Sequence, residues 1–465
     1  MKPISIMHTN FEKKSVKHCV AVFGGAVAGS EAAFQLASKG IRVVIFEQSL
    51  LPYGKIEDGL PKWHYKLRDQ EEQRIDDKID HPNIWYVPNI RLGTDISFQN
   101  LREWGFSAFI LATGAWRDRP LPIENLDDYI DDGLYYQNPF VHWFNHKHEP
   151  DYDGPAHEIS DDAVVIGGGL ASLDVVKILM IETVATALDK RGIECDLFTL
   201  ERKGIGPFLE SLDLTLDGLG LKGCTLYYRR RALDMPLSPM PTDTPEKLEK
   251  ARTIRQKILN NFQKKYLFRF VPNCVPVDKI IQDGRLTGIT FQRTRIEDDR
   301  VSPIKDEYFD VKTQLVISSI GSTPEKIEGL PSQGQVFKIT DPKTCLIKGF
   351  DNVFAIGNAV TGKGNINESV KHSKEISTGI IDNFFEWQQD QYRNWHRQTV
   401  TKVDHDIDQI IGKIENQPDL QEDVFNKILE NVSMMQKKAG YDGNYRAWIN
   451  KHLPVRLENV LSRNE

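Results

Sequence analysis

Short runs of apolar, β-branched residues alternate in this chain with segments whose apolar residues recur at helical spacing. The segment "VAVFGGAVAGSEAAFQLASKGIRVVIFE", residues 20–47, has the pattern of a strand, a glycine turn, a helix and a second strand that ends in an acid. The segment "DAVVIGGGLASLDVVKILM", residues 162–180, repeats the first three of these features. Each segment predicts a parallel, doubly wound sheet with helices between its strands.

Three further segments have the pattern of buried strands followed by small residues: 103–115, 313–324 and 349–360. Together with the glycine turns they predict two nested nucleotide-binding, Rossmann-like α/β domains, the second inserted in the first. We place the inserted domain at 116–322 and the outer domain at 1–115 and 323–465. The polar segment after Ser369 carries amphipathic patterns and is predicted to form a helical C-terminal region.

The first glycine turn is predicted to bind a dinucleotide. Glycines let the backbone approach a pyrophosphate, and the N-terminus of the following helix favours an anion. Gly24, Gly25 and Gly29 are present, and Ala26 replaces one glycine at the cost of a methyl group. Glu47 ends the next strand, at the spacing of the acid that binds ribose hydroxyls. A carboxylate repels a 2′-phosphate, so this site should take FAD or NAD.

The second glycine turn is predicted to bind a different nucleotide. Glycines occupy 167–169, and Ser172 stands at the last, small-residue position. The next strand of this unit is predicted within 224–236, and arginines at 229–231 follow its apolar part. Guanidinium groups suit a 2′-phosphate, so the site is interpreted as an NADPH site. A solvated basic strand end is the alternative interpretation.

Net charge, the length of apolar runs and the spacing of the cysteines exclude several classes of protein. A formal charge of −7 over 465 residues argues against a general nucleic-acid binder. No run approaches the ~18 apolar residues of a membrane span, and the first residues lack the features of a signal or transit peptide, so we expect a cytoplasmic protein. The five cysteines are far apart, which removes the usual signal for a redox dithiol, a zinc site or an iron–sulfur cluster. We therefore expect no metal site, free and mostly buried thiols, and electron chemistry supplied by a bound cofactor.

Several motifs resemble those of the adrenodoxin reductase family, the glutathione-reductase-like class of ferredoxin–NADP reductases. "FEQSLLPYGKIEDGLPKWH", "NPFVHWFNH", "AVVIGGGLASLDVVKIL", "TLYYRRRAL", "LVISSIGS" and "VFAIGNAVTGKGNINES" each resemble a motif of that family, in the family's order. The similarity covers nearly the whole chain. It implies a flavoenzyme that oxidises NADPH through bound FAD and passes single electrons to a small, ferredoxin-like iron–sulfur protein.

The resemblance and the two turns together indicate the residues that bind the nucleotides. The predicted FAD residues are Gly24, Ala26, Gly29, Glu47, Gly54, Lys55, Ile56, Thr113, Gly114, Gly357, Asn358, Gly364, Asn365 and Ile366. The predicted NADPH residues are Gly167, Gly169, Leu170, Ala171, Ser172, Arg230 and Arg231. Asp174 matches a family aspartate that could be purely structural.

The chain departs from the family where flavin and nicotinamide would meet. Lys55 replaces a leucine, Asn358 replaces a tryptophan, and Lys363 lies in a segment without the family's arginine. A lysine near the flavin would stabilise an anionic reduced ring and raise its potential. His64 matches a family histidine and is the predicted catalytic residue, as a proton relay or an anchor for water; a structural histidine is the alternative.

Other functions remain open from the sequence. The basic residues of the predicted helix at 251–266 could dock an acidic iron–sulfur protein, or could simply form a solvated face. An electron-input subunit like the small subunit of glutamate synthase is one alternative, although its N-terminal cysteine-rich domain is missing. An FAD oxidoreductase acting on a small molecule and a non-catalytic sensor of redox nucleotides are the others.

Overall fold

The computed structural model describes residues 16–237, 242–341, 345–361 and 384–461. Its first sheet has seven strands in the order β17-β18-β19-β4-β1-β2-β3. The five strands from β19 to β3 run parallel, and β17 and β18 continue the sheet antiparallel. The bounds are β1 (Cys19–Phe23), β2 (Arg42–Phe46), β3 (Ile84–Val87), β4 (Ala108–Leu111), β17 (Ile339–Asp341), β18 (Leu346–Ile347) and β19 (Val353–Ala355).

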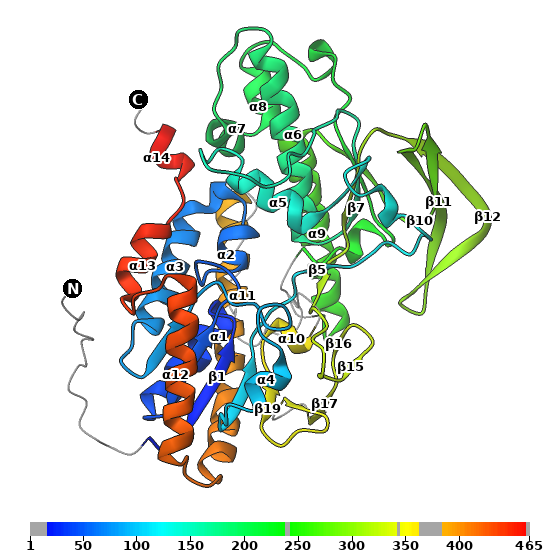
Figure 1. The fold of residues 1–465 in the computed structure, drawn as a ribbon. Coiled ribbons are helices and arrows are strands. Elements are labelled where there is room, and N and C mark those ends of the chain that lie inside the picture. The colour runs from blue at the N-terminus through cyan, green and yellow to red at the C-terminus, as the bar shows by residue number, and fades with distance from the viewer. Residues whose placement is uncertain (1–15, 238–241, 342–344, 362–383, 462–465) are drawn as a thin grey trace.

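Helices cover both faces of this sheet (Figure 1). Alternate residues of a strand point to opposite faces, and both faces are apolar here, as a parallel sheet requires. Val20 and Val22 of β1 pack with α1 (Val27–Ser38), α3 (Tyr65–Ile79) and α11 (Phe384–Glu415). On the other face, Ala21 and Phe23 belong to a core with α4 (Phe98–Arg102) and α12 (Glu422–Ala439).

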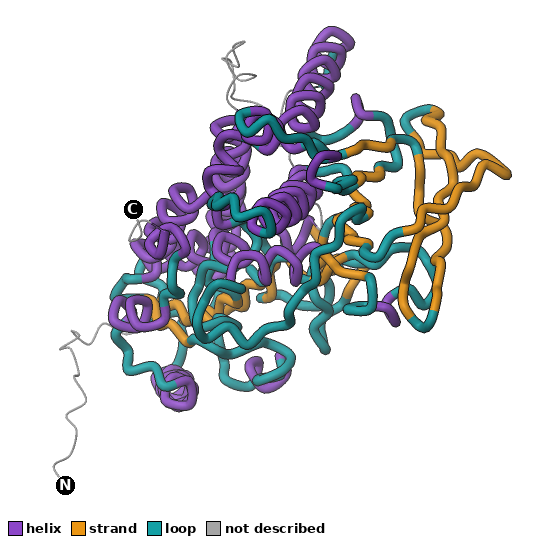
Figure 2. Tube along the Cα trace, turned by 90° about the horizontal axis from the view of Figure 1, so that it is seen from above, coloured by secondary structure: helices purple, strands orange, loops and turns teal. Residues whose placement is uncertain are grey.

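The second sheet has five parallel strands in the order β6-β13-β7-β8-β9. They are β6 (Leu134–Tyr136), β7 (Val164–Gly167), β8 (Thr225–Tyr227), β9 (Arg269–Val271) and β13 (Val316–Ser319). One face packs against α5 (Gln137–His146), α6 (Leu170–Asp189) and α9 (Pro245–Tyr266). The other face packs against an antiparallel sheet of β10 (Cys274–Gln282), β11 (Arg285–Glu297) and β12 (Arg300–Lys312). Figure 2 shows this antiparallel sheet at one end of the molecule.

Two short crossing strands connect the sheets. β5 (Arg117–Asp118) leaves the first sheet, and β14 (Ser322–Thr323) returns to it, and the two pair antiparallel. The boundaries proposed from the sequence, 115/116 and 322/323, fall in this connection. The first sheet takes its strands only from the flanking segments and the second sheet only from the segment between them.

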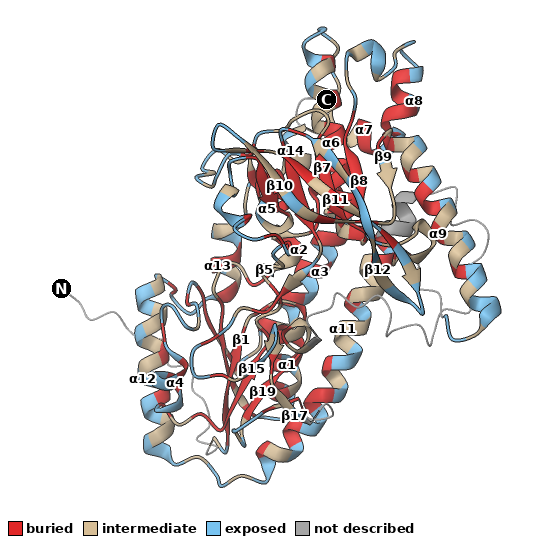
Figure 3. Ribbon diagram, turned by 90° about the vertical axis from the view of Figure 1, so that its right-hand side faces the viewer, coloured by how far each residue is buried: buried red, intermediate tan, exposed pale blue. Residues whose placement is uncertain are grey.

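The remaining elements are short. They are α2 (Lys55–Asp58), η1 (Lys62–His64), η2 (Asp127–Tyr129), α7 (Leu197–Lys203), α8 (Ile205–Glu210), η3 (Asp217–Leu219), η4 (Ala232–Asp234), β15 (Ser332–Gln333), β16 (Val336–Phe337), α10 (Asn358–Thr361), α13 (Tyr445–His452) and α14 (Leu457–Leu461). Buried residues concentrate in the strands and in the helix faces turned toward them, whereas the outer side of α12 is exposed (Figure 3).

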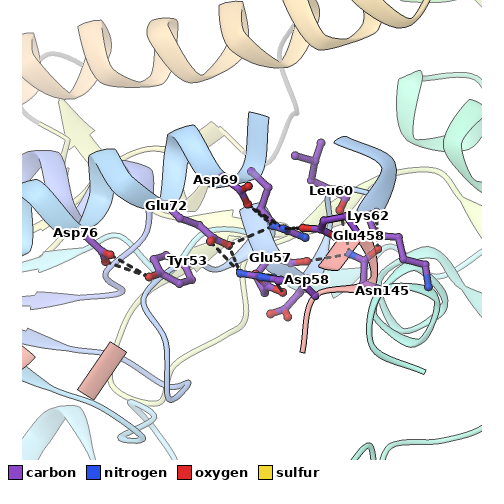
Figure 4. Close-up of polar contacts among 12 residues, drawn as sticks. Tyr53, Glu57, Asp58, Leu60, Lys62, Asp69, Glu72, Asp76, Asn145 and Glu458 are labelled. Atoms are coloured by element: carbon purple, nitrogen blue, oxygen red, sulfur yellow. Dashed lines mark hydrogen bonds and ion pairs between the residues drawn. The ribbon is translucent and has the colours of Figure 1, made fainter. Parts of the chain in front are cut away.

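The C-terminal helical region is a structural part of the first unit. α11 runs along α1, and α12 contacts β3. Arg456, just before α14, pairs with Glu57 of α2 and Glu72 of α3. Figure 4 shows these two glutamates close to each other. This buried charge cluster ties the end of the chain to the elements that follow the first glycine turn.

Most predicted elements are confirmed, with one correction at the start of α9. The prolines and polar residues of 235–250 predict a loop before the helix expected at 251–266, but Pro245–Lys250 form the first turns of that helix. The Thr244 side chain accepts a hydrogen bond from the Lys247 amide at 3.3 Å and caps the helix, and Pro245 suits its first turn. All five cysteines are free, and only Cys195 is not buried. Within the described ranges, no helix is long and apolar enough to cross a membrane.

Candidate functional site

A cleft opens at the carboxyl ends of β1, β2 and β4, and its empty space, including the open solvent at its mouth, is about 1100 Å³. Its wall is formed by the N-terminus of α1, by α2, by residues 112–116 after β4, and by Trp395 and Thr399 of α11. In parallel α/β sheets this edge is where ligands bind. The first N–H groups of α1 have no partner within the helix, and Ala26, Val27 and Ala28 line the cleft there. An anionic group is therefore favoured at this end.

The first glycine turn is packed so closely that larger residues are excluded. Gly24 has a φ of +96°, and a Cβ atom there would lie 2.6 Å from the Ala112 carbonyl oxygen. A Cβ atom on Gly29 would lie 1.8 Å from the Gly24 carbonyl oxygen. Gly29 thus lets α1 approach the turn, although it does not itself line the cleft. Ala26 does line it, so its methyl group faces the ligand space.

Glu47 is a buried acid at the cleft wall. Its two carboxylate oxygens accept hydrogen bonds from the amides of Gly25, at 2.7 Å, and Ser49, at 3.0 Å. Burial raises the pKa of the Glu47 carboxyl to about 7, and the backbone hydrogen bonds oppose that rise. The carboxylate keeps further acceptor capacity beyond these two bonds, as binding of ribose hydroxyls requires.

The segment after β4 carries a polar group that lacks a partner. The Thr113 hydroxyl lines the cleft, is buried, and forms no hydrogen bond with the described part of the chain. Gly114, with a φ of +68°, lies beside it in the wall. A buried hydroxyl that is left unsatisfied costs about 1–3 kcal/mol, which a ligand in the cleft would recover.

Lys55 connects the cleft to the second unit. Its ammonium donates hydrogen bonds to Asn138 Oδ1, at 3.0 Å, and Ser322 Oγ, at 3.2 Å. It also lies 5.6 Å from the centre of the Trp116 ring. Burial lowers the pKa of Lys55 to about 8, which the charge of Asp118 opposes. Burial likewise raises the pKa of Asp118 to about 6, opposed by Lys55.

Most predicted FAD residues meet at this cleft. Gly24, Ala26, Glu47, Gly54, Lys55, Ile56, Thr113, Gly114 and Asn358 all line it. Gly357 packs behind them, because a Cβ atom there would lie 3.0 Å from Ala28 Cβ. The predicted residues Gly364, Asn365 and Ile366, and also Lys363, lie outside the described residues.

Sequence reasoning missed Trp116, Asn138 and Trp395. Trp116 comes directly after the predicted strand end and could have been included on that ground. Trp395 lines the cleft and Asn138 contacts Lys55, and both come from elements that only the tertiary fold brings to these places.

The second glycine turn joins β7 to α6. A Cβ atom on Gly167 would lie 2.4 Å from the Ser319 carbonyl oxygen, and one on Gly168 would lie 2.1 Å from the Tyr228 ring. A Cβ atom on Gly169 would instead meet open space. Leu170 and Ala171 begin α6, and the Ser172 hydroxyl donates a hydrogen bond to the Gly169 carbonyl at 2.8 Å. The open side of this turn is therefore at Gly169.

Arg230 and Arg231 follow β8, next to β7 in the sheet as predicted. Both already have acidic partners, which sequence reasoning missed. Arg231 Nε donates to Asp234 Oδ2 at 2.8 Å, and Arg230 pairs with Asp299. The Arg231 side chain remains 43% exposed, so a phosphate can reach it.

The structure encloses His64. Its side chain is fully buried beside the Trp63 and Tyr392 rings and is not part of the cleft wall. Burial, with the charge of Lys177, lowers the pKa of His64 well below its usual value, so the ring is neutral. Its role as a proton relay remains a prediction. Asp174, left open from the sequence, accepts a hydrogen bond from the Tyr392 hydroxyl at 2.5 Å, a contact between α6 and α11.

The predicted basic face of α9 is not a single exposed face. Arg255 is buried, and its guanidinium donates a hydrogen bond to the Leu233 carbonyl at 3.1 Å. Lys265 is half-buried, and burial lowers its pKa to about 8. The buried Arg255 therefore does not belong to an exposed docking surface, whereas docking by the other basic residues of this helix stays a prediction.

Comparisons with known proteins agree with the motifs. No protein-family model matches the chain. The mitochondrial NADPH:adrenodoxin oxidoreductase of Arabidopsis thaliana is 26% identical over 352 residues, 67% of this chain and 69% of that protein. The NADPH-ferredoxin reductase FprA of Mycobacterium leprae is 24% identical over 407 residues, 79% of this chain and 84% of that protein. A glutamate synthase (NADPH) small chain from Bacillus subtilis is 29% identical over 282 residues, 56% of this chain and 52% of that protein.

A solved structure confirms the fold. FprA of Mycobacterium tuberculosis, in complex with NADPH, superimposes with a TM-score of 0.63 at 18% identity, covering 90% of this chain and 91% of that one. The sequence similarities to the two reductases confirm the family resemblance of the motifs, and the superposition confirms the expected fold.

Proposed function

We propose that this chain, a homologue of the NADPH:adrenodoxin oxidoreductases, is an FAD-dependent enzyme that oxidises NADPH and delivers the electrons to a small iron–sulfur protein. The observation that carries the proposal is the cleft behind the first glycine turn, with the buried Glu47 carboxylate and the unsatisfied Thr113 hydroxyl in its wall. The Thr113 hydroxyl lacks a partner, Glu47 has acceptor capacity left, and the cleft lies at the sheet edge where nucleotides bind in this class of fold.

The residues of the first cleft fit FAD. The turn at Gly24 and the N-terminus of α1 would hold the pyrophosphate, because Gly24 has no side chain and the first N–H groups of α1 have no partner within the helix. Glu47 would accept hydrogen bonds from the ribose hydroxyls and repel a 2′-phosphate. Lys55 would place a cation beside the isoalloxazine ring. Bound FAD accepts a hydride and can release electrons singly.

The second glycine turn fits NADPH. Gly169 leaves the N-terminus of α6 open, and Arg230 and Arg231 lie at the end of the neighbouring strand. Their guanidinium groups would exchange their present acidic partners, Asp299 and Asp234, for the 2′-phosphate. The chain thus supplies alignment and charge, with no need of a protein nucleophile.

The iron–sulfur acceptor follows from the names of the relatives. The NADPH:adrenodoxin oxidoreductase and the NADPH-ferredoxin reductase FprA both match more than two thirds of their own length. The glutamate synthase small chain matches about half of its length, and that similarity supports an electron-input subunit as the second candidate function. A cytoplasmic location is part of the proposal; the plant relative is named as mitochondrial.

Reduction of cytochrome c by NADPH, measured with FAD-loaded protein, tests the acceptor. We expect a slow rate that rises at least tenfold when a ferredoxin is added. The same slow rate with and without ferredoxin would contradict an iron–sulfur acceptor, and an increase only on addition of a glutamate synthase large chain would support the second candidate.

A further inference from the structure

A cluster of two imidazoles and one carboxylate lies between α2 and α5. His142 and His146 are one helical turn apart on α5, and Asp58 ends α2. The Asp58 Oδ1 atom lies 3.2 Å from His146 Nε2 and 3.7 Å from His142 Nε2. One ligand atom from each of the three residues lies within 4.8 Å of the other two.

These separations suit a tetrahedral metal ion. A Zn²⁺ ion binds nitrogen and oxygen at about 2.0–2.2 Å, so two of its ligand atoms lie about 3.3 Å apart. The distances from Asp58 are close to this value, and both histidines approach with Nε2. Three protein ligands of this kind leave a fourth position for water.

A further carboxylate orients one of the histidines. The Nδ1 atom of His146 lies 2.5 Å from Glu149 Oε1. A carboxylate only accepts hydrogen bonds, so Nδ1 carries a proton and Nε2 is directed at Asp58. Metal-binding histidines commonly have such a partner on the second ring nitrogen.

Asn145 holds the two helices in register. Its side-chain amide donates hydrogen bonds to the carbonyls of Glu57, at 2.9 Å, and Leu60, at 3.0 Å, and accepts one from the Lys62 amide at 3.0 Å. Figure 4 shows Asn145 beside Leu60 and Lys62, with Asp58 close by. The cluster is therefore preformed by contacts that do not involve its own ligand atoms.

We propose that Asp58, His142 and His146 bind one divalent transition-metal ion of the Zn²⁺ class, with Glu149 as the positioning residue. The ion would connect the two units, because Ile56 of α2 belongs to a core of the first sheet and Phe140 and Phe144 of α5 to the core of the second. The sequence predicted no metal site because that prediction considered only cysteine spacing. A His-x-x-x-His pair on a helix was a signal that it did not use.

The site is accessible and chemically selective. His142 is 46% exposed at its side chain, so an ion can enter from solvent, whereas His146 is buried. Imidazole and carboxylate ligands suit Zn²⁺, Ni²⁺ and Cu²⁺, and they disfavour Ca²⁺ and Mg²⁺, which prefer oxygen ligands. The same geometry would also hold a protonated His146 between Asp58 and Glu149 without any metal, and binding experiments separate the two arrangements.

Calorimetric titration of the full-length, FAD-loaded, chelator-treated protein with Zn²⁺ tests the proposal. We expect one saturable site, weakened at least tenfold by Asp58→Asn and by His142→Ala. Glu149→Gln should weaken binding about 10- to 100-fold, as loss of an orienting partner does. His405→Ala removes an exposed histidine of α11 and should leave the affinity unchanged.

Thermal unfolding is a second measurement, and it tests whether the bound ion stabilises the contact between the two units. Saturating Zn²⁺ should raise the thermal unfolding midpoint of the unsubstituted protein and of His405→Ala, but not that of Asp58→Asn. Absence of saturable binding, or equal affinity in the unsubstituted protein and in a variant that combines Asp58→Asn with His142→Ala, would overturn the proposal. Either result would leave a protonated histidine held by two carboxylates, and neither depends on NADPH oxidation.

Discussion

Glu47 and Lys55 carry opposite charges in the wall of one cleft, where Glu47 is buried and Lys55 is half-buried. Burial shifts the pKa of each toward its neutral form, to about 7 for the carboxyl and about 8 for the ammonium. Groups shifted in this way cluster at functional sites. Glu47 could be identified from the sequence, because its place after a glycine turn and helix is characteristic. The hydrogen-bond partners of Lys55, Asn138 and Ser322, could not be identified, because they lie 83 and 267 residues away.

The raised pKa of Glu47 predicts how the stability of FAD-free protein depends on pH. Its folded pKa, about 7, exceeds the ordinary 4.5, so its stabilising contribution is complete below pH 4.5 and is lost as pH rises through 7. Glu47→Gln removes this titration. The free energy of unfolding of the variant, relative to the unsubstituted protein, should therefore rise by about 2–3 kcal/mol from pH 5 to pH 8.

Urea unfolding at the two pH values measures this difference. Glu103→Gln, at an exposed carboxylate, is the control and should show a difference that does not change with pH. A pH-independent difference for Glu47→Gln as well would contradict the burial of this carboxyl.

The position of Lys55 in the cleft predicts that it raises the reduction potential of bound FAD. Its cation should stabilise the reduced, anionic ring, so Lys55→Gln should lower the two-electron midpoint potential by about 30 mV or more, equivalent to about 1.4 kcal/mol. Dye-coupled reduction measures the potential. The control is Lys39→Gln, at an exposed lysine after α1, which should leave the potential unchanged. Equal potentials for the two variants would place Lys55 away from the ring.

At the scale of elements, the strands and helices of both parallel sheets were predictable because they are buried on both faces and read as short apolar runs. The antiparallel sheet of β10, β11 and β12 was not predicted. Its strands are half-buried, with Ile289 and Phe291 turned to the core and Tyr308 55% exposed, so their pattern is weaker. The first turns of α9 were missed because prolines were interpreted as loop signals, although Pro245 stands at a permitted position.

The two arginines that follow β8 predict a preference for NADPH over NADH. Replacing both Arg230 and Arg231 by glutamine removes the charge that would pair with a 2′-phosphate. We expect kcat/KM for NADPH to fall about 100-fold, consistent with loss of charge-assisted hydrogen bonds, and kcat/KM for NADH to change less than about threefold. Arg300→Gln, at an exposed residue of β12, is the control. An equal loss for both nucleotides would show that the arginines support the fold and not the phosphate.

At the scale of the whole molecule, residues distant in sequence hold the two units and the C-terminal segment together. Arg456 donates hydrogen bonds to both carboxylates of the cluster, at 2.6 Å to Glu57 Oε2 and 2.9 Å to Glu72 Oε2. Burial and the neighbouring Glu57 raise the pKa of the Glu72 carboxyl, and the charge of Arg456 opposes that rise. No local pattern marks this cluster, since its members are separated by up to 399 residues.

Breaking this cluster should destabilise the protein. Arg456→Met leaves Glu57 buried without its main partner, and we expect a loss of about 3 kcal/mol in the free energy of unfolding. Arg446→Met is the matched control, because Arg446 also pairs with acids of the same region but is 39% exposed, and its loss should cost less than about 1 kcal/mol. Chemical unfolding of both variants measures the two costs, and similar small values would mean that the cluster adds nothing to stability.

A single absorbance experiment shows whether one chain holds FAD and takes a hydride from NADPH. FAD is added to the purified protein, unbound flavin is removed, and NADPH is introduced under argon while the flavin absorption is followed. We expect the protein to retain about one FAD per chain and its yellow colour to bleach on addition of NADPH. A protein that retains no flavin, or whose flavin stays oxidised in the presence of NADPH, would contradict it.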